Sequence, residues 1–453
     1  MRALSRETYD VLVVGGGIVG AGIARDAALR GYRVALVEQH DLAWGTSSRA
    51  TRLIHGGLRY LERYDFGLVR SDLRERETLL RIAPHLVFPL PFLLPVYRRG
   101  RLYRAKVRAG MHLYDLLSRG KSLPGRQRLD REETLRAEPG LDPDGLQGAW
   151  RFHDAQAPYM ERLVVENALD AAAHGAAVLT HARVERFLRD GTGRVVGAVV
   201  SDLASGGRQL EVRARLVVNA TGPWLDIQSA EVRPRARPLL RLTKGVHLVT
   251  PRATREAHVL FARSDGRLFF VIPWLGYSLV GTTDTDLTGD PAEASADADD
   301  VAYLAAEAKR AFPDASFERI HYTWAGVRAL VRREGVKEGD VSRQHALFDH
   351  EAREGVPGLL SIVGGKITAY RSIAEAAVDL IGRKLGRRVK CETHRRPLPG
   401  GHLDSLAAYV ERELSPRASA LGLDPACAGH LGRVYGSLAH GVLDLVEREP
   451  ALG

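Results

Sequence analysis

The chain has 453 residues, 45% of them hydrophobic, which is enough for two or three domains with a large core. Its formal net charge of +10 admits an anionic membrane surface, a nucleic acid or a small acidic substrate as a partner. A nucleic acid is disfavoured, because the basic residues are spread along the chain without a lysine-rich tail or zinc-finger spacing.

Residues 9–38 have the pattern of a strand, a glycine turn, a helix and a second strand. Gly15, Gly17 and Gly20 are spaced as G-x-G-x-x-G, and Glu38 ends the second strand about 20 positions later. The first two glycines permit a tight turn and the approach of a pyrophosphate, and the third lets the helix pack on its strand. Glu38 is expected to accept a ribose hydroxyl. We predict a dinucleotide site; the alternative is a purely structural glycine turn.

Residues 45–61 combine hydroxyl side chains with a later pair of glycines. We predict that a helix starts at the hydroxyl residues, where free N–H groups can meet a phosphate. The glycine pair is expected to end that helix and to let a flat ring lie against the backbone. The alternative is a capped surface helix that carries a solvated arginine. The residues concerned are Thr46, Ser47, Ser48, His55, Gly56, Gly57, Arg59 and Tyr60.

A proline-broken apolar run at residues 86–97 is followed by a basic amphipathic segment. Placed on a helix, its apolar side chains share one stripe with arginines on the flank. This is the pattern of a helix in the headgroup region of an anionic membrane. It is equally that of an ordinary amphipathic helix on a core, and Lys106 interrupts the stripe. The stripe is Leu102, Ala105, Ala109, Leu113, Leu116 and Leu117, and the flank is Arg101, Arg104, Arg108 and Arg119.

The middle of the chain alternates between helical and strand patterns. A helix is predicted at residues 162–173 and a buried strand before the small-residue turn Ala220-Thr221-Gly222, which suits a second backbone approach to a cofactor. Residues 236–345 are mainly strand-like, with a helix at 301–312. The aspartates before that helix favour its dipole, so the acidic loop is predicted to be a solvated cap and not a metal site.

Near residue 364 a predicted strand leads through Gly364-Gly365 into a helix start that carries Lys366. A reduced flavin bears negative charge over N1 and the C2 carbonyl, which a helix N-terminus and an ammonium group stabilise. The alternative is an ordinary turn with an exposed lysine.

The only two cysteines, Cys391 and Cys427, fit neither a disulfide framework nor a metal cluster. The sequence also lacks a run of about 18 apolar residues that would span a bilayer. We therefore expect a cytoplasmic protein without a metal site.

Seven stretches occur in order along the chain: IVGAGIARDAALRG, GTSSRATRLIHGGLRYLE, RLVVNATGPW, TKGVHLV, GTTDTD, WAGVRAL and GGKITAYR. This set, colinear from about residue 9 to residue 371, resembles the FAD-dependent glycerol-3-phosphate dehydrogenase family. The resemblance implies an α/β flavoprotein-oxidase fold and oxidation of sn-glycerol 3-phosphate to dihydroxyacetone phosphate by hydride transfer to flavin N5. It also implies that electrons pass to membrane quinone and that the protein attaches peripherally to the cytoplasmic face of the cell membrane; a homodimer stays open.

The resemblance further implies a domain organisation. A discontinuous Rossmann-like FAD-binding domain would comprise residues 9–85, 150–235 and 355–395. A β-rich substrate and membrane-facing domain would comprise residues 86–149 and 236–354. Residues 396–453 would form part of a helical C-terminal domain that is shorter than in the family.

Roles for individual residues follow from the same resemblance. His247 is the candidate base for the substrate hydroxyl, since imidazole has an unperturbed pKa of about 6.5; the alternative is a structural strand histidine. Arg59 and Arg328 would grip the phosphate as planar donors and, with His247 and Lys366, form the catalytic set. Tyr60, Lys366 and Thr368 would complete the substrate pocket. FAD would contact Gly15, Gly17, Ile18, Val19, Gly20, Glu38, Gln39, Thr46, Ser47, Ser48, His55, Gly56, Gly57, Leu58, Ala220, Thr221, Gly222, Gly365, Lys366, Ile367 and Thr368.

Three other functions stay open. A soluble glycerol-3-phosphate oxidase that releases peroxide shares the same motifs. An amino-acid oxidase on this fold is disfavoured, because its carboxylate pocket does not require two arginines and a lysine. A basic binding protein that has lost catalysis is the alternative from another class. In the family the phosphate arginine precedes a proline, whereas Ala329 follows Arg328 here.

Overall fold

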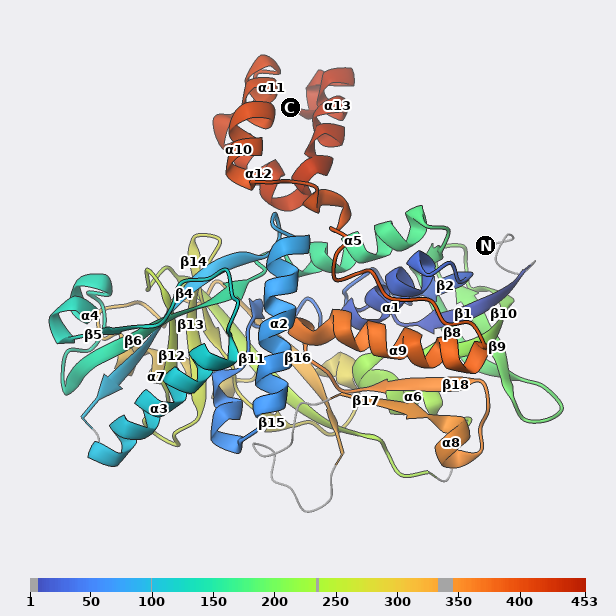
Figure 1. Ribbon diagram of the computed structural model, residues 1–453, viewed down its shortest axis with the longest axis horizontal. Helices are drawn as coiled ribbons and strands as arrows, with labels where there is room; N and C mark the ends of the chain where they lie inside the picture. The colour runs from blue at the N-terminus through green and yellow to red at the C-terminus, as the bar shows by residue number, and fades with distance from the viewer. Residues whose placement is uncertain (1–6, 99, 234–235, 333–344) are drawn as a thin grey trace.

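Two β-sheets and the helices that cover them make up the computed structural model, which describes residues 7–98, 100–233, 236–332 and 345–453 (Figure 1). Within these residues the first sheet has the order β17-β18-β10-β1-β2-β7, and β9 and β8 extend it from β10. β1 pairs in parallel with both β10 and β2. The strands are β1 (Thr8–Val14), β2 (Val34–Val37), β7 (Ala177–Leu179), β8 (Ala182–Arg189), β9 (Val195–Asp202), β10 (Arg208–Asn219), β17 (Ala346–Asp349) and β18 (Leu359–Val363).

Helix α1 (Ile18–Leu29) follows β1 and packs against α5 (Met160–Ala173) and α9 (Tyr370–Leu385). Since β1 is covered on both faces, its residues form the continuous apolar run that is typical of parallel strands. A Cβ atom on Gly22 of α1 would lie 2.9 Å from the ring of Tyr370, so the glycine allows α1 and α9 to approach closely. The helix predicted at residues 162–173 is confirmed as α5.

The second sheet has the order β15-β11-β14-β13-β12-β4-β6-β3, with β16 paired to β11 and β5 to β6, in the described part of the chain. Most of its pairs are antiparallel. Its strands are β3 (Leu53–Ile54), β4 (Phe88–Tyr97), β5 (Gln127–Leu129), β6 (Leu146–Gln156), β11 (Leu240–Pro251), β12 (Ala257–Phe261), β13 (Leu268–Trp274), β14 (Tyr277–Gly281), β15 (Thr285–Asp286) and β16 (Tyr322–Val331).

Strand β4 lies inside this sheet although it contains three prolines. It pairs along most of its length with β6, but its pairing with β12 is confined to Phe92 and Leu93. Proline lacks an N–H donor and is normally confined to sheet edges. The short contact with β12 leaves most of that side of β4 as an edge.

Helix α2 (Phe66–Ile82) runs between the two sheets in Figure 1, and α3 (Arg101–Leu117) follows β4. Helix α7 (Ala298–Ala311) packs on β11 and β14, close to the predicted range of 301–312. The Asp297 and Asp300 side chains each accept the other's backbone N–H, so the predicted acidic cap is confirmed. The shorter helices are α4 (Arg131–Ala137), α6 (Leu225–Ser229), α8 (His350–Glu354), α10 (Leu406–Tyr409), α11 (Ser415–Ala420), α12 (Pro425–Tyr435) and α13 (Ala439–Arg448).

The prediction that a helix starts at residues 46–48 is wrong. The structure has consecutive turns there, followed by the short strand β3. Ser48 Oγ donates to the carbonyls of Trp44 and Gly45, and Arg49 donates to the same two carbonyls. These local side-chain bonds satisfy the backbone in a turn and compete with a helix.

The C-terminal helices α10–α13 stand as a separate tier above both sheets (Figure 1). Buried Glu166 of α5 holds the segment that leads into them, because it accepts hydrogen bonds from His85 at 2.9 Å and from the Gly400 N–H at 3.2 Å. The expected FAD-binding segments also contribute β3 and β6 to the second sheet, and the expected substrate segment 236–354 contributes β17 to the first. Residues 99, 234–235 and 333–344 of the expected domains lie outside the described residues.

Candidate cofactor and substrate site

A cavity of about 620 Å³ lies where the carboxyl ends of β1, β2, β10 and β18 meet residues of the second sheet. Its volume is within the usual range for cofactor and ligand sites, and its position is the one that open α/β sheets use. The predicted residues that line it are Gly15, Gly17, Ile18, Val19, Glu38, Gln39, Thr46, Ser47, His55, Gly57, Leu58, Arg59, Tyr60, Ala220, Thr221, Gly222, His247, Arg328, Gly365, Lys366, Ile367 and Thr368.

A glycine cradle forms one end of the cavity. Gly15 has a φ of +109°, and a Cβ atom there would lie 2.6 Å from the carbonyl oxygen of Ala220. Helix α1 starts after Gly17, which has no side chain to occupy the space in front of the first-turn N–H groups. The N-terminus of a helix attracts a pyrophosphate, so this end of the cavity fits a dinucleotide.

Glu38 at the end of β2 is held by backbone donors. Its two carboxylate oxygens accept the N–H groups of Gly16 at 2.7 Å and His40 at 2.9 Å. A carboxylate has about four lone-pair positions, so acceptor capacity remains for the ribose hydroxyl expected there.

Alanine at Gly15 is expected to weaken FAD binding about 10-fold or more, since a side chain at this positive φ is strained and meets Ala220. The measurement is the ratio of FAD to protein after purification and dialysis. Gly429→Ala in α12 is the matched control, because a Cβ atom there meets nothing within 4 Å. Equal FAD content in both variants would contradict the role of the cradle.

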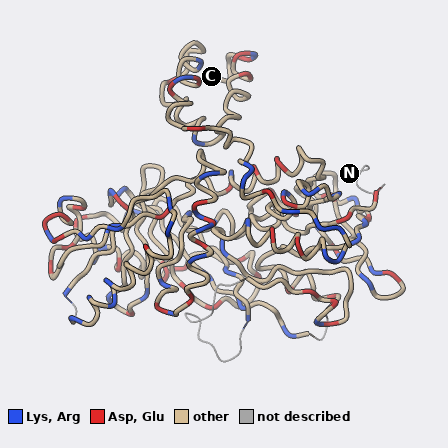
Figure 2. Tube along the Cα trace, in the orientation of Figure 1, with Lys and Arg blue, Asp and Glu red and all other residues tan. Residues whose placement is uncertain are grey.

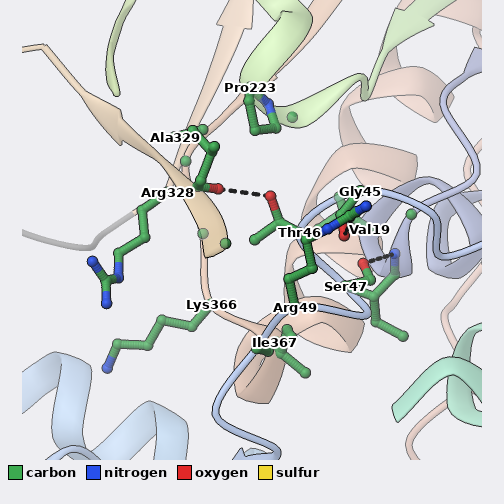
Figure 3. A pocket seen from close by; sticks show the side chains of 18 of the residues that line it. Val19, Gly45, Thr46, Ser47, Arg49, Pro223, Arg328, Ala329, Lys366 and Ile367 are labelled. Carbon is green, nitrogen blue, oxygen red and sulfur yellow. Dashed lines mark hydrogen bonds between the residues drawn. The ribbon is translucent and has the colours of Figure 1, made fainter. Parts of the chain in front are cut away.

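Two hydroxyls of the turn before β3 face the cavity. Thr46 donates to the carbonyl of Val327 at 2.6 Å, and Ser47 Oγ accepts the Ile18 N–H at 3.0 Å; both bonds are drawn in Figure 3. They tie the first strand–helix unit to β16 of the second sheet.

Three residues expected to contact the cofactor lie outside the lining of the cavity as the described residues form it. Ser48 is bonded within its own turn. Gly56 donates its N–H to the Tyr114 hydroxyl at 3.1 Å. Gly20 packs on Gly15 and so shapes the cradle from behind, as its predicted packing role requires.

His247 lies on β11 and is only 2% exposed. Its Nε2 atom lies 2.9 Å from the Thr51 hydroxyl, and its ring stacks on Trp324. Burial, with the charges of Arg328 and Arg52, lowers the pKa of His247 to about 3. The imidazole is therefore neutral, and its Nδ1 atom has no hydrogen-bond partner among the described residues.

Arg328 lies on β16, directly beside β11. Its guanidinium donates to Asp284 at 2.9 Å and to the Thr282 hydroxyl at 2.8 Å. A Cβ atom on Gly245 would collide with this guanidinium, so the glycine of TKGVHLV makes room for it. Figure 3 shows the Arg328 and Lys366 side chains extending in the same direction. The arrangement gives the cavity a cationic end beside His247.

Several residues of the site were not predicted: Thr51 lines the cavity, and Trp324, outside the described lining, stacks on His247. Thr51 and Trp324 fall within the quoted motifs but are not marked by any glycine or charge pattern, and only the structure shows that they hold His247. Val184 and Glu185 of β8 line the cavity although they are far from every motif. The pairing of β8 in the sheet brings these two residues to the cavity, and the spacing of residues in the sequence does not predict that pairing.

The family model of FAD-dependent oxidoreductases matches residues 10–371. A glycerol-3-phosphate dehydrogenase of Synechocystis is 39% identical over 99% of this chain and 83% of its own length. The chain belongs to the FAD-dependent glycerol-3-phosphate dehydrogenase family. FAD is accordingly its cofactor, as the fit of the cradle and the family model both support.

Solved structures agree with this membership. The glycerol-3-phosphate dehydrogenase of Bacillus halodurans, complexed with FAD, has a TM-score of 0.80 and 32% identity, covering 98% of this chain and 78% of its own. An L-α-glycerophosphate oxidase of Mycoplasma pneumoniae, with FAD bound, has a TM-score of 0.64 at 20% identity, covering 87% of this chain and 99% of its own. The second likeness shows the shared flavoprotein fold alone.

Proposed function

We propose that this dehydrogenase-family chain oxidises sn-glycerol 3-phosphate to dihydroxyacetone phosphate. The observation that carries the proposal is one cavity in which a dinucleotide cradle continues into a pocket with a neutral histidine and cationic side chains. The names of its full-length relatives support the substrate. When bound, FAD supplies the two-electron acceptor of the reaction.

The cationic end of the cavity is assigned to the substrate's phosphate. Arg328 presents a rigid planar fork that suits a dianion, and Lys366 and Arg59 line the same cavity. Arg328 is itself fixed by Asp284 and Thr282, so little conformational freedom is lost when the anion binds. Tyr60 and Thr368 complete the walls.

His247 is assigned as the acceptor of the hydroxyl proton. In the free protein the charge of Arg328 contributes to the low pKa of His247. A phosphate dianion against Arg328 offsets that charge, so the proton affinity of His247 rises when the substrate is in place. The base is thus neutral before binding and becomes stronger in the complex.

Substrate selectivity tests this proposal. The purified holoenzyme is assayed with an artificial dye acceptor and with glycerol 3-phosphate, glycerol, glycine or proline. We expect kcat/KM for glycerol 3-phosphate to exceed that for glycerol by at least about 100-fold, the value of two charge-assisted contacts. Turnover of an amino acid in preference to glycerol 3-phosphate would overturn the assignment.

Quinone is proposed as the physiological acceptor, and the soluble oxidase remains the competing function. The dehydrogenase and the oxidase differ in whether they release peroxide when oxygen is the acceptor. Stoichiometric peroxide on addition of glycerol 3-phosphate would establish the oxidase. Reduction of a water-soluble quinone without peroxide supports the dehydrogenase.

We also propose peripheral attachment to the cytoplasmic face of the cell membrane, and helix α3 supports contact with an anionic membrane surface. Met111 and Tyr114 are buried against the second sheet, whereas Leu102 is 86% and Leu116 50% exposed. The flanking Arg101, Arg104, Arg108 and Arg119 are all exposed, and Figure 2 shows this corner rich in Lys and Arg. In the described residues, no helix has the length and apolar character needed to cross a bilayer.

Aspartate at both Leu102 and Leu116 is expected to weaken binding to phosphatidylglycerol vesicles at least about 10-fold, because each leucine contributes roughly 1.5–3 kcal/mol when buried. Co-sedimentation with vesicles measures the effect, and dye-linked activity should stay unchanged. Leu445→Asp on α13 is the control, since Leu445 is 48% exposed and α13 lies away from α3 in Figure 1. Equal loss in the control would contradict a specific membrane surface.

A further inference from the structure

The inner face of α2 buries three charged residues beside its apolar ones. Asp72 and Arg76 are fully buried and Glu75 is 5% exposed. Glu75 binds Arg371 of α9 through two bonds of 2.8 and 2.6 Å, and Arg76 binds Asp154 of β6 at 2.6 Å. Carboxylates are almost never buried to this extent unless they are paired. These two pairs join α2 to α9 and to β6.

Asp72 pairs with a residue of the cavity wall. Its Oδ2 atom accepts a hydrogen bond from Lys366 Nζ, and Lys366 lines the cavity with a side chain that is 9% exposed. The other oxygen, Oδ1, has no hydrogen-bond partner among the residues that the structure describes. The pair therefore lies directly behind the surface that the substrate meets.

Two further residues, Tyr60 and Gly57, lie close to the Lys366 ammonium. Its Nζ atom lies 3.8 Å from the centroid of the Tyr60 ring, a cation–π distance. A Cβ atom on Gly57 would lie 3.2 Å from the same Nζ, so a side chain at Gly57 would crowd the ammonium. Lysine has a flexible stem that carries about 2 kcal/mol of rotamer entropy. The carboxylate and the ring thus contact the ammonium, and Gly57 leaves room for it.

The charge state of Asp72 is consistent with this arrangement. Burial raises the pKa of Asp72 to about 6, and Lys366 opposes that rise. The carboxylate is ionised at neutral pH and above. An ammonium group has three N–H donors, so one bond to Asp72 leaves two for an anion in the cavity.

We propose that Asp72 is a positioning residue that holds the Lys366 ammonium at the cavity wall, aimed at the phosphate group of the substrate. The proposal rests on the proposed function, because it deepens the assignment of Lys366 to the phosphate. Asp72 acts on the substrate only through Lys366. Without it, the ammonium loses its strongest fixed acceptor and the stem regains its rotamers.

Asp72→Asn tests the proposal by two readouts. The KM for glycerol 3-phosphate is expected to rise about 10-fold, with kcat changed by less than about 3-fold, since an ammonium that is no longer held binds the phosphate less well in ground and transition state alike. Calorimetric titration of the holoenzyme with inorganic phosphate should show a similar increase in Kd. The second readout requires no turnover.

Glu75→Gln is the matched control. It removes an equivalent buried carboxylate one helical turn away, whose partner Arg371 lies outside the described lining of the cavity. The control is expected to leave the phosphate Kd at the wild-type value. Unchanged phosphate affinity in Asp72→Asn, or an equal loss in Glu75→Gln, would overturn the positioning role.

A second comparison, made in variants that lack Lys366, keeps the test decisive if Asp72→Asn does not fold. Lys366→Gln and the double variant Asp72→Asn/Lys366→Gln are expected to share one phosphate Kd, because Asp72 has no target once Lys366 is gone. A further loss in the double variant would contradict action through Lys366. Wild-type binding of phosphate without oxidation of glycerol 3-phosphate would refute the proposed function and leave the role of Asp72 intact.

Discussion

Asparagine at position 247 is expected to lower kcat by about 10²–10⁴-fold, the usual contribution of a general base. The amide is similar in size to imidazole and can still contact Thr51, but it cannot accept the hydroxyl proton. FAD content and KM should change little, because the phosphate is held elsewhere. Dye-linked steady-state kinetics with glycerol 3-phosphate measures the effect.

His258→Asn provides the matched control for this experiment. His258 is also fully buried, its pKa is also lowered to about 3, and it lies on β12 outside the described lining of the cavity. A kcat loss confined to His247→Asn supports the base. If both variants lose activity equally, the loss reflects the packing of a buried histidine in either place, and the assignment of His247 as the base is refuted.

Lysine at position 328 is expected to raise the KM for glycerol 3-phosphate by about 10- to 100-fold while kcat falls much less. Lysine keeps the charge but loses the planar fork that can bind two phosphate oxygens and still contact Asp284 and Thr282. Substrate saturation curves separate the two constants.

Arg241→Lys is the corresponding control. Arg241 lies on β11 and forms a bidentate pair with Asp286 at 2.8 and 2.6 Å, outside the lining that the described residues give the cavity. Its replacement should leave KM unchanged. A normal KM in Arg328→Lys would show that the phosphate is bound elsewhere.

Local sequence patterns predicted the first strand–helix unit and the glycine cradle, since each depends on residues close in sequence. Gly15 shows why: its positive φ and the nearness of Ala220 leave no room for a side chain, and such positions are marked by glycine itself. The capped helix α7 was predicted for the same reason, because Asp297 and Asp300 are three residues apart. The resemblance, not spacing, supplied His247 and Arg328.

Features set by long-range pairing were not predictable in this way. The sequence does not show that charged residues of α2 are buried, because Asp72 pairs with Lys366, which is 294 residues away along the chain. The turn before β3 has the hydroxyls of a helix start, but their bonds to nearby carbonyls prevent the helix. On α3 the sequence predicted one apolar stripe, whereas tertiary contacts bury Met111 and Tyr114, which lie outside that stripe, and leave Leu102 of the stripe exposed.

Anaerobic mixing of the FAD-loaded protein with glycerol 3-phosphate tests the central claim most directly: that this cavity holds a phosphorylated alcohol beside the cofactor and oxidises it. The account predicts that glycerol 3-phosphate bleaches the visible flavin absorbance within one turnover, whereas glycerol at the same concentration leaves it unchanged. A flavin that keeps its colour with glycerol 3-phosphate, or that is bleached equally by glycerol, would contradict the account.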